Sequence, residues 1–99
     1  MHNFEKLFFW QRSISLTKQI YLKCKDVNSD EKFGLISQMK RCAVSIPSNI
    51  AEGSGRNSNK EFNHFLGIAL GSAFELQTQL ILVKELNLLS KTDTNEMLL

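Results

Sequence analysis

Residues 60–89 read KEFNHFLGIALGSAFELQTQLILVKELNLL, and this stretch decides the fold. After position 61, only Glu75, Lys84 and Glu85 carry a charge within it. Apolar residues recur three and four positions apart, which predicts a single long α-helix over these residues. Because apolar side chains occupy nearly every side of that helix, we expect it to be buried among other helices.

At 100° per residue, the apolar residues of this helix fall on three faces. The main face is expected to point into the core and consists of Phe62, Phe65, Leu66, Ala69, Ala73, Leu76, Leu80 and Val83. The other two hold Leu70, Phe74, Ile81 and Leu88, and Ile68, Leu82 and Leu86. Three companion helices seldom cover every side of a fourth, so we expect Phe74 and Ile81 to lie in an oligomer interface. Gly67 and Gly71, four positions apart, would allow another helix to approach closely.

A second helix is predicted over about residues 30–53, with Ser29 as its N-cap. Pro47 lies inside its apolar pattern, and because the pattern continues past the proline, we expect a kink rather than an end. Gly53 and Gly55 are expected to end the helix. Its core stripe consists of Leu35, Met39, Cys42, Ile46 and Ile50.

The first helix is predicted over residues 4–25. Its apolar residues form two stripes about 120° apart: Trp10, Ile14 and Tyr21 on one, and Phe9, Leu16 and Ile20 on the other. One stripe can face the core, and we expect Phe9, Leu16 and Ile20 to contact another subunit. Residues 95–99 begin a fourth helix, which is either naturally very short or truncated.

Ninety-nine residues form one domain, residues 1–99, and one proline and five glycines leave little material for a turn-rich β fold. The net charge of +2 is too weak to imply a nucleic-acid or membrane partner by itself. The basic excess lies in residues 1–25, which hold five basic residues and one acid. We find no signal peptide and no apolar run of about 18 residues, so we expect a cytoplasmic protein without a membrane partner.

No arrangement of residues typical of an active site is found. His2 and His64 lack metal ligands at suitable spacing, and Cys24 and Cys42 are 18 positions apart, which is neither a zinc nor a redox spacing. We therefore expect buried, reduced thiols, no metal, no cofactor and no catalytic residues.

A polar stripe interrupts the otherwise apolar pattern of residues 30–53. It consists of Gln38, Arg41, Ser45, Ser48 and Glu52, spaced three, four, three and four, with Pro47 and Asn49 beside it. Short polar side chains are poor helix formers, so their presence inside a helix indicates a specific role. The leading interpretation is hydrogen bonding across a helix or subunit seam, with Arg41 and Glu52 neutralising each other. Contact with a ligand or nucleic acid and simple solvation remain alternatives.

Residues 38–53, QMKRCAVSIPSNIAEG, resemble the four-helix-bundle family named after 23S rRNA intervening sequences. The resemblance covers nearly the whole chain. It extends to Trp10-Gln11, residues 31–35, Arg56, Ser58, Glu61-Phe62, Phe65-Leu66, residues 69–72 and Glu75-Leu76.

This resemblance implies an all-α, antiparallel up-down-up-down bundle that assembles into rings, usually pentamers. Family members are commonly encoded in insertions within bacterial 23S ribosomal RNA genes. Their relatives, the accessory variability proteins of diversity-generating retroelements, bind nucleic acid and a reverse transcriptase. The implied partners are therefore further copies of the chain, RNA or DNA, and a protein such as a reverse transcriptase, and the family supplies no catalytic residues.

Two functions follow as hypotheses. The first is a non-enzymatic oligomeric bundle that binds RNA or DNA weakly through basic residues of a ring, namely Arg12, Lys18, Lys23, Lys25, Lys40, Arg41 and Arg56. The alternative is a protein-interaction adaptor or scaffold with no nucleic-acid role, whose apolar faces serve only assembly.

Overall fold

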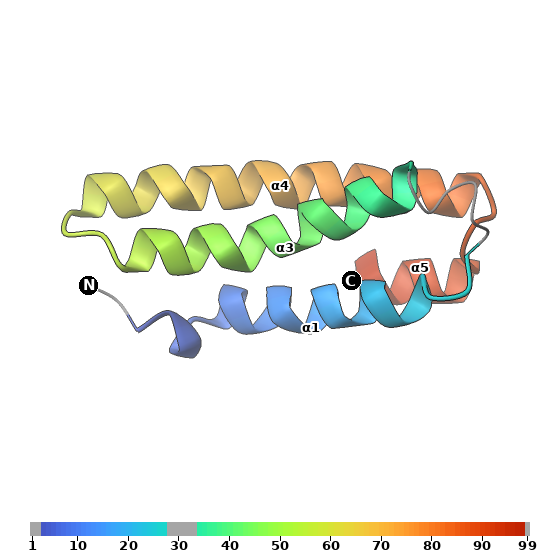
Figure 1. The fold of residues 1–99 in the computed structure, drawn as a ribbon, viewed down its shortest axis with the longest axis horizontal. Helices are drawn as coiled ribbons and strands as arrows, with labels where there is room; N and C mark the ends of the chain where they lie inside the picture. Colours follow the sequence, from blue (N-terminus) through green and yellow to red (C-terminus); the bar gives the residue numbers. More distant parts are fainter. Residues whose placement is uncertain (1–2, 28–33, 99) are drawn as a thin grey trace.

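The computed structural model describes residues 3–27 and 34–98. Helices account for 82% of this part of the chain, which contains no strands. Successive long helices run antiparallel along the long axis of the molecule (Figure 1), which measures 44 Å. The elements are a 3₁₀ turn, η1 (Phe4–Lys6), and the helices α1 (Phe8–Lys23), α3 (Leu35–Ser54), α4 (Asn59–Glu85) and α5 (Lys91–Leu98). The prediction of an all-α four-helix bundle with a short fourth helix is confirmed.

The N-terminal segment does not form the single helix predicted over residues 4–25. Leu7 has an extended backbone (φ −75°, ψ 127°) that separates η1 from α1, and α1 ends at Lys23. The break folds Phe4 back onto Trp10, with ring centroids 5.3 Å apart and the rings edge to face. This aromatic contact and the packing of Leu7 against the core are available only when the helix is interrupted.

The helix α3 packs more extensively on α4 than on any other helix. It continues through Pro47, and its two halves run in different directions (Figure 1). The helix ends at Ser54 with Gly55 as its C-cap. Gly53 does not end the helix as predicted but lies inside it, where α3 and α4 are in close contact. The predicted start of this helix near residue 30 and the Ser29 cap lie outside the described residues.

Gly53 is required by this close contact. An added Cβ atom at Gly53 would lie 2.7 Å from Cβ of Phe65 and 3.2 Å from the carbonyl oxygen of Phe62. The turn that follows ends at Ser58, whose hydroxyl accepts a hydrogen bond from the backbone N–H of Glu61 at 3.2 Å. This hydrogen bond caps the N-terminus of α4, as the Ser58-x-x-Glu61 spacing favours, and it starts α4 where the two helices can pair.

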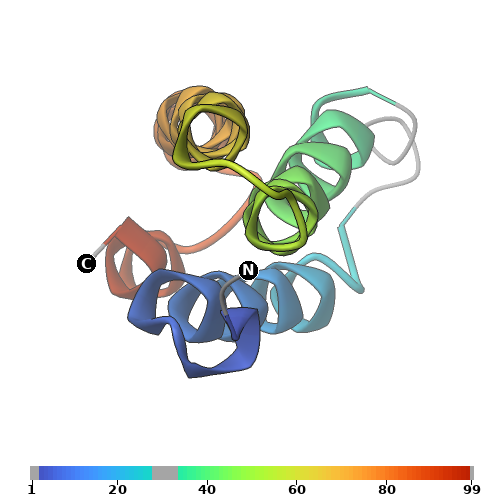
Figure 2. The ribbon, with the colours of Figure 1, turned by 90° about the vertical axis from the view of Figure 1, so that its left-hand side faces the viewer.

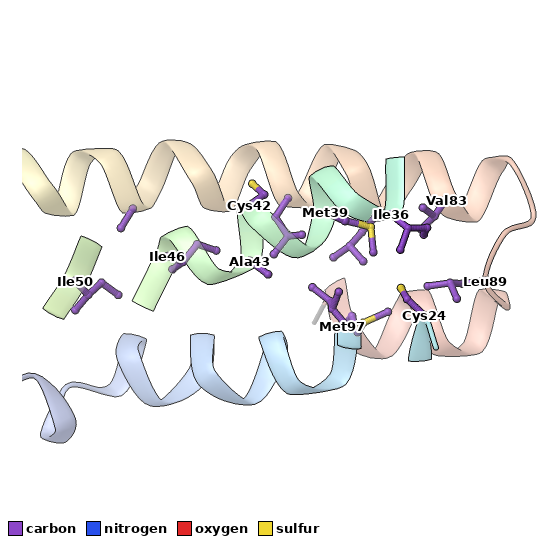
Figure 3. Close-up of a cluster of buried hydrophobic side chains, with 14 residues drawn as sticks. Cys24, Ile36, Met39, Cys42, Ala43, Ile46, Ile50, Val83, Leu89 and Met97 are labelled. Carbon is purple, nitrogen blue, oxygen red and sulfur yellow. The ribbon is translucent and has the colours of Figure 1, made fainter. Parts of the chain in front are cut away.

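The core lies between all four helices (Figure 3). The predicted main face of α4 points into it, with Ala69, Leu76, Leu80 and Val83 buried. Deeply buried apolar side chains from the rest of the described residues are Ile20, Cys24, Ile36, Met39, Ala43, Ile50 and Met97.

The side of α1 that faces the core corrects one prediction. Ile20 is fully buried (0% exposed), so its assignment to an oligomer interface is wrong. Ser13 and Thr17 share this face, and the Thr17 hydroxyl donates to the backbone oxygen of Ala43 at 3.2 Å. Because Ser13 and Thr17 are small, α1 can approach α3 closely. Because they are also polar, a count of apolar residues does not show that this side of α1 faces the core.

The connection between α4 and α5 begins earlier than predicted, because α4 ends at Glu85 rather than near Leu89. Asn87 adopts a left-handed backbone (φ 57°), and the N–H of Leu88 donates to the oxygen of Val83 at 2.9 Å. This turn brings Leu89 into the core. The Ser90 hydroxyl then accepts a hydrogen bond from the N–H of Asp93 at 3.0 Å, in the first turn of α5.

The hydropathy of α4 also differs from the sequence expectation. By length and composition alone, this helix could cross a membrane, since an 18-residue window has a mean hydropathy of 1.4. Only 28% of that window is buried within the chain. The sequence expectation concerned a run of about 18 apolar residues, which polar residues such as Glu75 and Gln77 interrupt in α4, but the mean hydropathy of the helix still reaches that of a membrane span, and much of its apolar surface remains uncovered.

Candidate assembly and nucleic-acid surfaces

The back of α4, the side facing away from the core, is an exposed apolar surface. Gly67, Gly71 and Thr78 fall along its middle at 100° per residue. A Cβ atom added at either glycine would have no neighbour within 4 Å among the described residues. The exposed apolar side chains that flank the middle are Ile68, Leu70, Phe74, Ile81, Leu82 and Leu86. This α4 back face has the small-residue centre and apolar flanks on which a second helix packs closely.

The structure divides the predicted interface residues among three places. Phe74, 61% exposed, and Ile81 belong to the α4 back face. Phe9, 75% exposed, and the half-buried Leu16 line a groove beside α1 instead. Ile20 is in the core, as described above. Phe74 and Ile81 therefore share one accessible face of the chain, and Phe9 and Leu16 share another.

Lys23 is engaged by α5. Its Nζ atom lies 3.0 Å from Oδ1 of Asp93 and 2.8 Å from Oε2 of Glu96. The hydrogen bonds to Glu96 and Asp93 raise the pKa of Lys23, and the bond from Lys23 lowers the pKa of Asp93. The Lys23 charge, which the sequence analysis grouped with the nucleic-acid contacts, is therefore paired with two carboxylates of α5.

Three other predicted basic residues gather around Tyr21. Nζ of Lys40, from α3, lies 5.1 Å from the centroid of the Tyr21 ring on α1. Lys18 is exposed three positions before Tyr21 and shares its side of α1, and Lys25 is exposed in the turn that follows α1. We call these four residues the Tyr21 patch. Sequence reasoning named the lysines but missed Tyr21, although the spacing of three between Lys18 and Tyr21 could have shown it.

The remaining basic residues lie apart. Arg12 lines the groove beside α1. Arg41 is exposed on α3 and donates from Nη2 to the Ser37 hydroxyl at 3.4 Å. Arg56 forms an ion pair with Glu52, and its guanidinium lies 4.8 Å from the ring centroid of Phe65. The seven predicted basic residues therefore do not form one surface on a single chain.

The predicted polar seam is split between the inside and outside of the bundle. The hydroxyls of Ser45 and Ser72 lie 2.9 Å apart and join α3 to α4. Nδ2 of Asn49 donates to the backbone oxygen of Ser45 at 2.8 Å and to its hydroxyl at 3.0 Å. By contrast, Gln38, Arg41, Ser48 and Glu52 are exposed. Among the described residues of the stripe, Ser45 alone forms a hydrogen bond to another helix, and Asn49 supports Ser45 from within α3.

Arg41 and Glu52 do not neutralise each other. Eleven residues separate them, which corresponds to about 16 Å along an α-helix. Glu52 instead forms an ion pair with Arg56, four positions along the chain.

Both cysteines are buried and free. Burial, with a further contribution from Glu75, raises the pKa of Cys42 to about 11, and burial also raises the pKa of Cys24. Both thiols are therefore protonated at neutral pH and are poor nucleophiles and metal ligands. Within residues 3–27 and 34–98, no group of three or more His, Cys, Asp or Glu residues could hold a metal ion.

Comparison with known proteins agrees with this arrangement. Residues 5–99 match the family model described as 23S rRNA-intervening sequence protein. No curated protein matches the chain. The match covers almost all of the sequence, including all four α-helices. The chain therefore belongs to the 23S rRNA-intervening sequence protein family.

Proposed function

We propose that this protein is a non-enzymatic helical scaffold that assembles with copies of itself through the α4 back face. The observation that carries the proposal is the uncovered apolar surface around Gly67 and Gly71, with Phe74 and Ile81 beside them. A contiguous apolar surface of this kind marks an interaction site. A closed ring of copies, such as the pentamer that the resemblance implies, covers such a surface without forming filaments.

The test is Phe74→Glu, with Leu22→Glu as the matched control. Both side chains are 61% exposed, but Leu22 lies on α1 and away from the α4 back face. In sedimentation velocity at micromolar concentration, we expect the unmodified chain and Leu22→Glu to sediment as oligomers and Phe74→Glu as a monomer. An equal effect of the two substitutions would contradict an interface at this face.

Nucleic-acid binding is the second part of the proposal, and the Tyr21 patch supports it. Its three lysines can contact phosphate oxygens, and Tyr21 offers one aromatic face beside them. The Tyr21 patch of one copy generates only a weak electrostatic field. A ring contains several copies of the patch, and these can bind one polyanion at the same time. The expected binding is weak, poorly sequence-specific and strongly dependent on salt, because phosphate neutralisation releases counterions.

Fluorescence anisotropy with a structured RNA and a DNA duplex tests this part. We expect affinity to fall between low and physiological salt, and Lys18→Glu with Lys25→Glu to abolish binding at low salt. Lys6→Glu with Lys91→Glu is the charge-matched control, since both lysines are exposed and lie outside the Tyr21 patch. No binding by the unmodified oligomer at low salt would leave the protein-interaction adaptor as the function.

A further inference from the structure

The side of α1 that carries Tyr21 is apolar as well as basic. Ile14 lies seven positions before Tyr21, and Lys18 lies between them, four positions after Ile14 and three before Tyr21. At 100° per residue, these three side chains share one side of α1. All three are exposed, Ile14 by 43% and Tyr21 by 47%. A lysine therefore lies between two exposed apolar side chains along this side of the helix.

A second lysine reaches the same place from α3. Nζ of Lys40 lies 5.1 Å from the centroid of the Tyr21 ring, which is within the range of a cation–π contact. Nearly half of the Tyr21 surface is still exposed with Lys40 in this position. In the end view, α1 lies beside α3, and α4 occupies the opposite corner of the bundle (Figure 2). The Tyr21 patch is therefore separate from the α4 back face.

The charge of this surface is uncompensated. Residues 6–25 include no acid. Lys18, Lys25 and Lys40 form no ion pair within the described residues. The positive charge beside the Tyr21 ring is thus available to an anionic ligand.

The combination of an aromatic ring with lysines favours a single strand over a duplex. A duplex presents its phosphates and the edges of its bases, but its base faces are stacked inside and cannot reach Tyr21. A single strand carries the same phosphates together with unpaired bases, which stack on aromatic side chains. Ile14 and Tyr21 are about 10 Å apart along the helix, the length of roughly three stacked nucleotides. A short run of unpaired nucleotides therefore fits the patch.

We propose that the Tyr21 patch binds single-stranded nucleic acid in preference to duplex, with one base stacked on Tyr21 beside Ile14 and phosphates on the lysines. This inference rests on the nucleic-acid binding proposed above for the same patch and adds the class of ligand. The recognising groups are an aromatic face and ammonium groups, so unpaired RNA and unpaired DNA share the chemistry that is required. An anionic lipid surface would need a broader apolar face than Ile14 and Tyr21 provide.

The probe is a fluorescent, mixed-sequence strand without self-complementarity, of about 20 nucleotides, several times the length of one patch. It is prepared as RNA and as DNA, and each form is tested alone and annealed to its complement. In anisotropy titrations at low salt, we expect the unmodified protein to bind the free strand about tenfold more tightly than the duplex.

Variants of the ring locate the preference. Tyr21→Ala should weaken binding of the free strand about tenfold and leave binding of the duplex unchanged, whereas Tyr21→Phe keeps the ring and should keep the preference. Phe8→Ala is the matched control. The Phe8 ring is 67% exposed but lies about 140° around α1 from Tyr21, so its removal should change neither affinity.

Tyr21 also offers a direct readout of stacking. It is the one tyrosine in the sequence, so selective labelling of tyrosine gives the nuclear magnetic resonance signals of a single ring. A stacked base should move these signals upfield when the free strand is added, and the duplex should not. This measurement uses the unmodified protein and does not depend on the stability of any variant.

The outcomes separate this inference from the proposed function. Equal affinities for strand and duplex, both unaffected by Tyr21→Ala, would overturn the preference for single strands and leave nucleic-acid binding through the lysines in place. An unshifted Tyr21 signal in the saturated complex would overturn the stacking. Failure of both strand and duplex to bind would overturn both proposals, and binding of phosphatidylserine vesicles in their place would assign the patch to a lipid surface.

Discussion

Glycines lie on both sides of α4, but one side is closely packed and the other is open. On the side towards α3, Gly53 of α3 meets Phe65 so closely that an added Cβ atom would lie 2.7 Å from that residue. On the back, an added Cβ atom at Gly67 or Gly71 would meet nothing within 4 Å among the described residues. The comparison teaches that a glycine spacing typical of close helix packing identifies a face, while only the structure shows whether this chain or another molecule covers it.

The largest expected effect is at the closed side. Gly53→Ala forces a methyl group against Cβ of Phe65 and the backbone oxygen of Phe62, and neither of these is the flexible end of a side chain. We expect the free energy of unfolding to fall by about 2 kcal/mol, measured by urea denaturation. An unchanged stability would show that α3 and α4 can move apart at no cost, which would remove the basis of the comparison.

Ser72→Ala probes the same side with a smaller expected effect. It removes the hydroxyl that lies 2.9 Å from the hydroxyl of Ser45, and we expect a loss of about 1 kcal/mol in urea denaturation. Ser48→Ala is the control, because Ser48 is exposed on α3 and lies outside the α4 back face. Equal losses would mean that the Ser45–Ser72 contact does not stabilise the helix pair.

Gly71→Ala probes the open side, and two readouts should move in opposite directions. Alanine has the higher helix propensity, so we expect the isolated chain to gain about 0.5–1 kcal/mol of stability. The same methyl group lies in the middle of the proposed subunit contact, so the oligomer should dissociate at higher protein concentration than the unmodified one. Stronger assembly would indicate that subunits meet elsewhere.

The smallest effect concerns the docking of α5. The pKa of Asp93 is lowered by its bond from Lys23, so its contribution is present at neutral pH and is lost as pH falls below about 4. We therefore expect Asp93→Asn to reduce stability slightly at pH 7 and to have a smaller effect at pH 3. Thermal melts at the two pH values measure this difference, and an equal effect at both would contradict the ion pair.

Much of the fold could be predicted, because periodicity reports burial directly. The core face of α4, the passage of α3 through Pro47 and the Ser58 cap all follow from residue spacing. The buried side of α1 could not be predicted from apolarity, since Ser13 and Thr17 lie on it. The break at Leu7 depends on the contact between Phe4 and Trp10, which spacing alone does not show.

The candidate surfaces were harder to predict, because they depend on how helices sit side by side. The sequence identified the lysines, yet the pairing of Lys23 with α5 and the position of Lys40 over Tyr21 arise only from packing between elements. The groove beside α1 likewise combines residues of α1, α3, α4 and α5. Contacts between residues close along the chain, such as the ion pair of Arg56 with Glu52 four positions away, could have been anticipated.

The mass of the unmodified chain in solution tests the central claim most directly. Multi-angle light scattering over a range of micromolar concentrations should give a mass several times the 11.3 kDa of one chain. That result is expected because the α4 back face has no cover among the described residues. A mass of 11.3 kDa at every concentration would contradict assembly through this face.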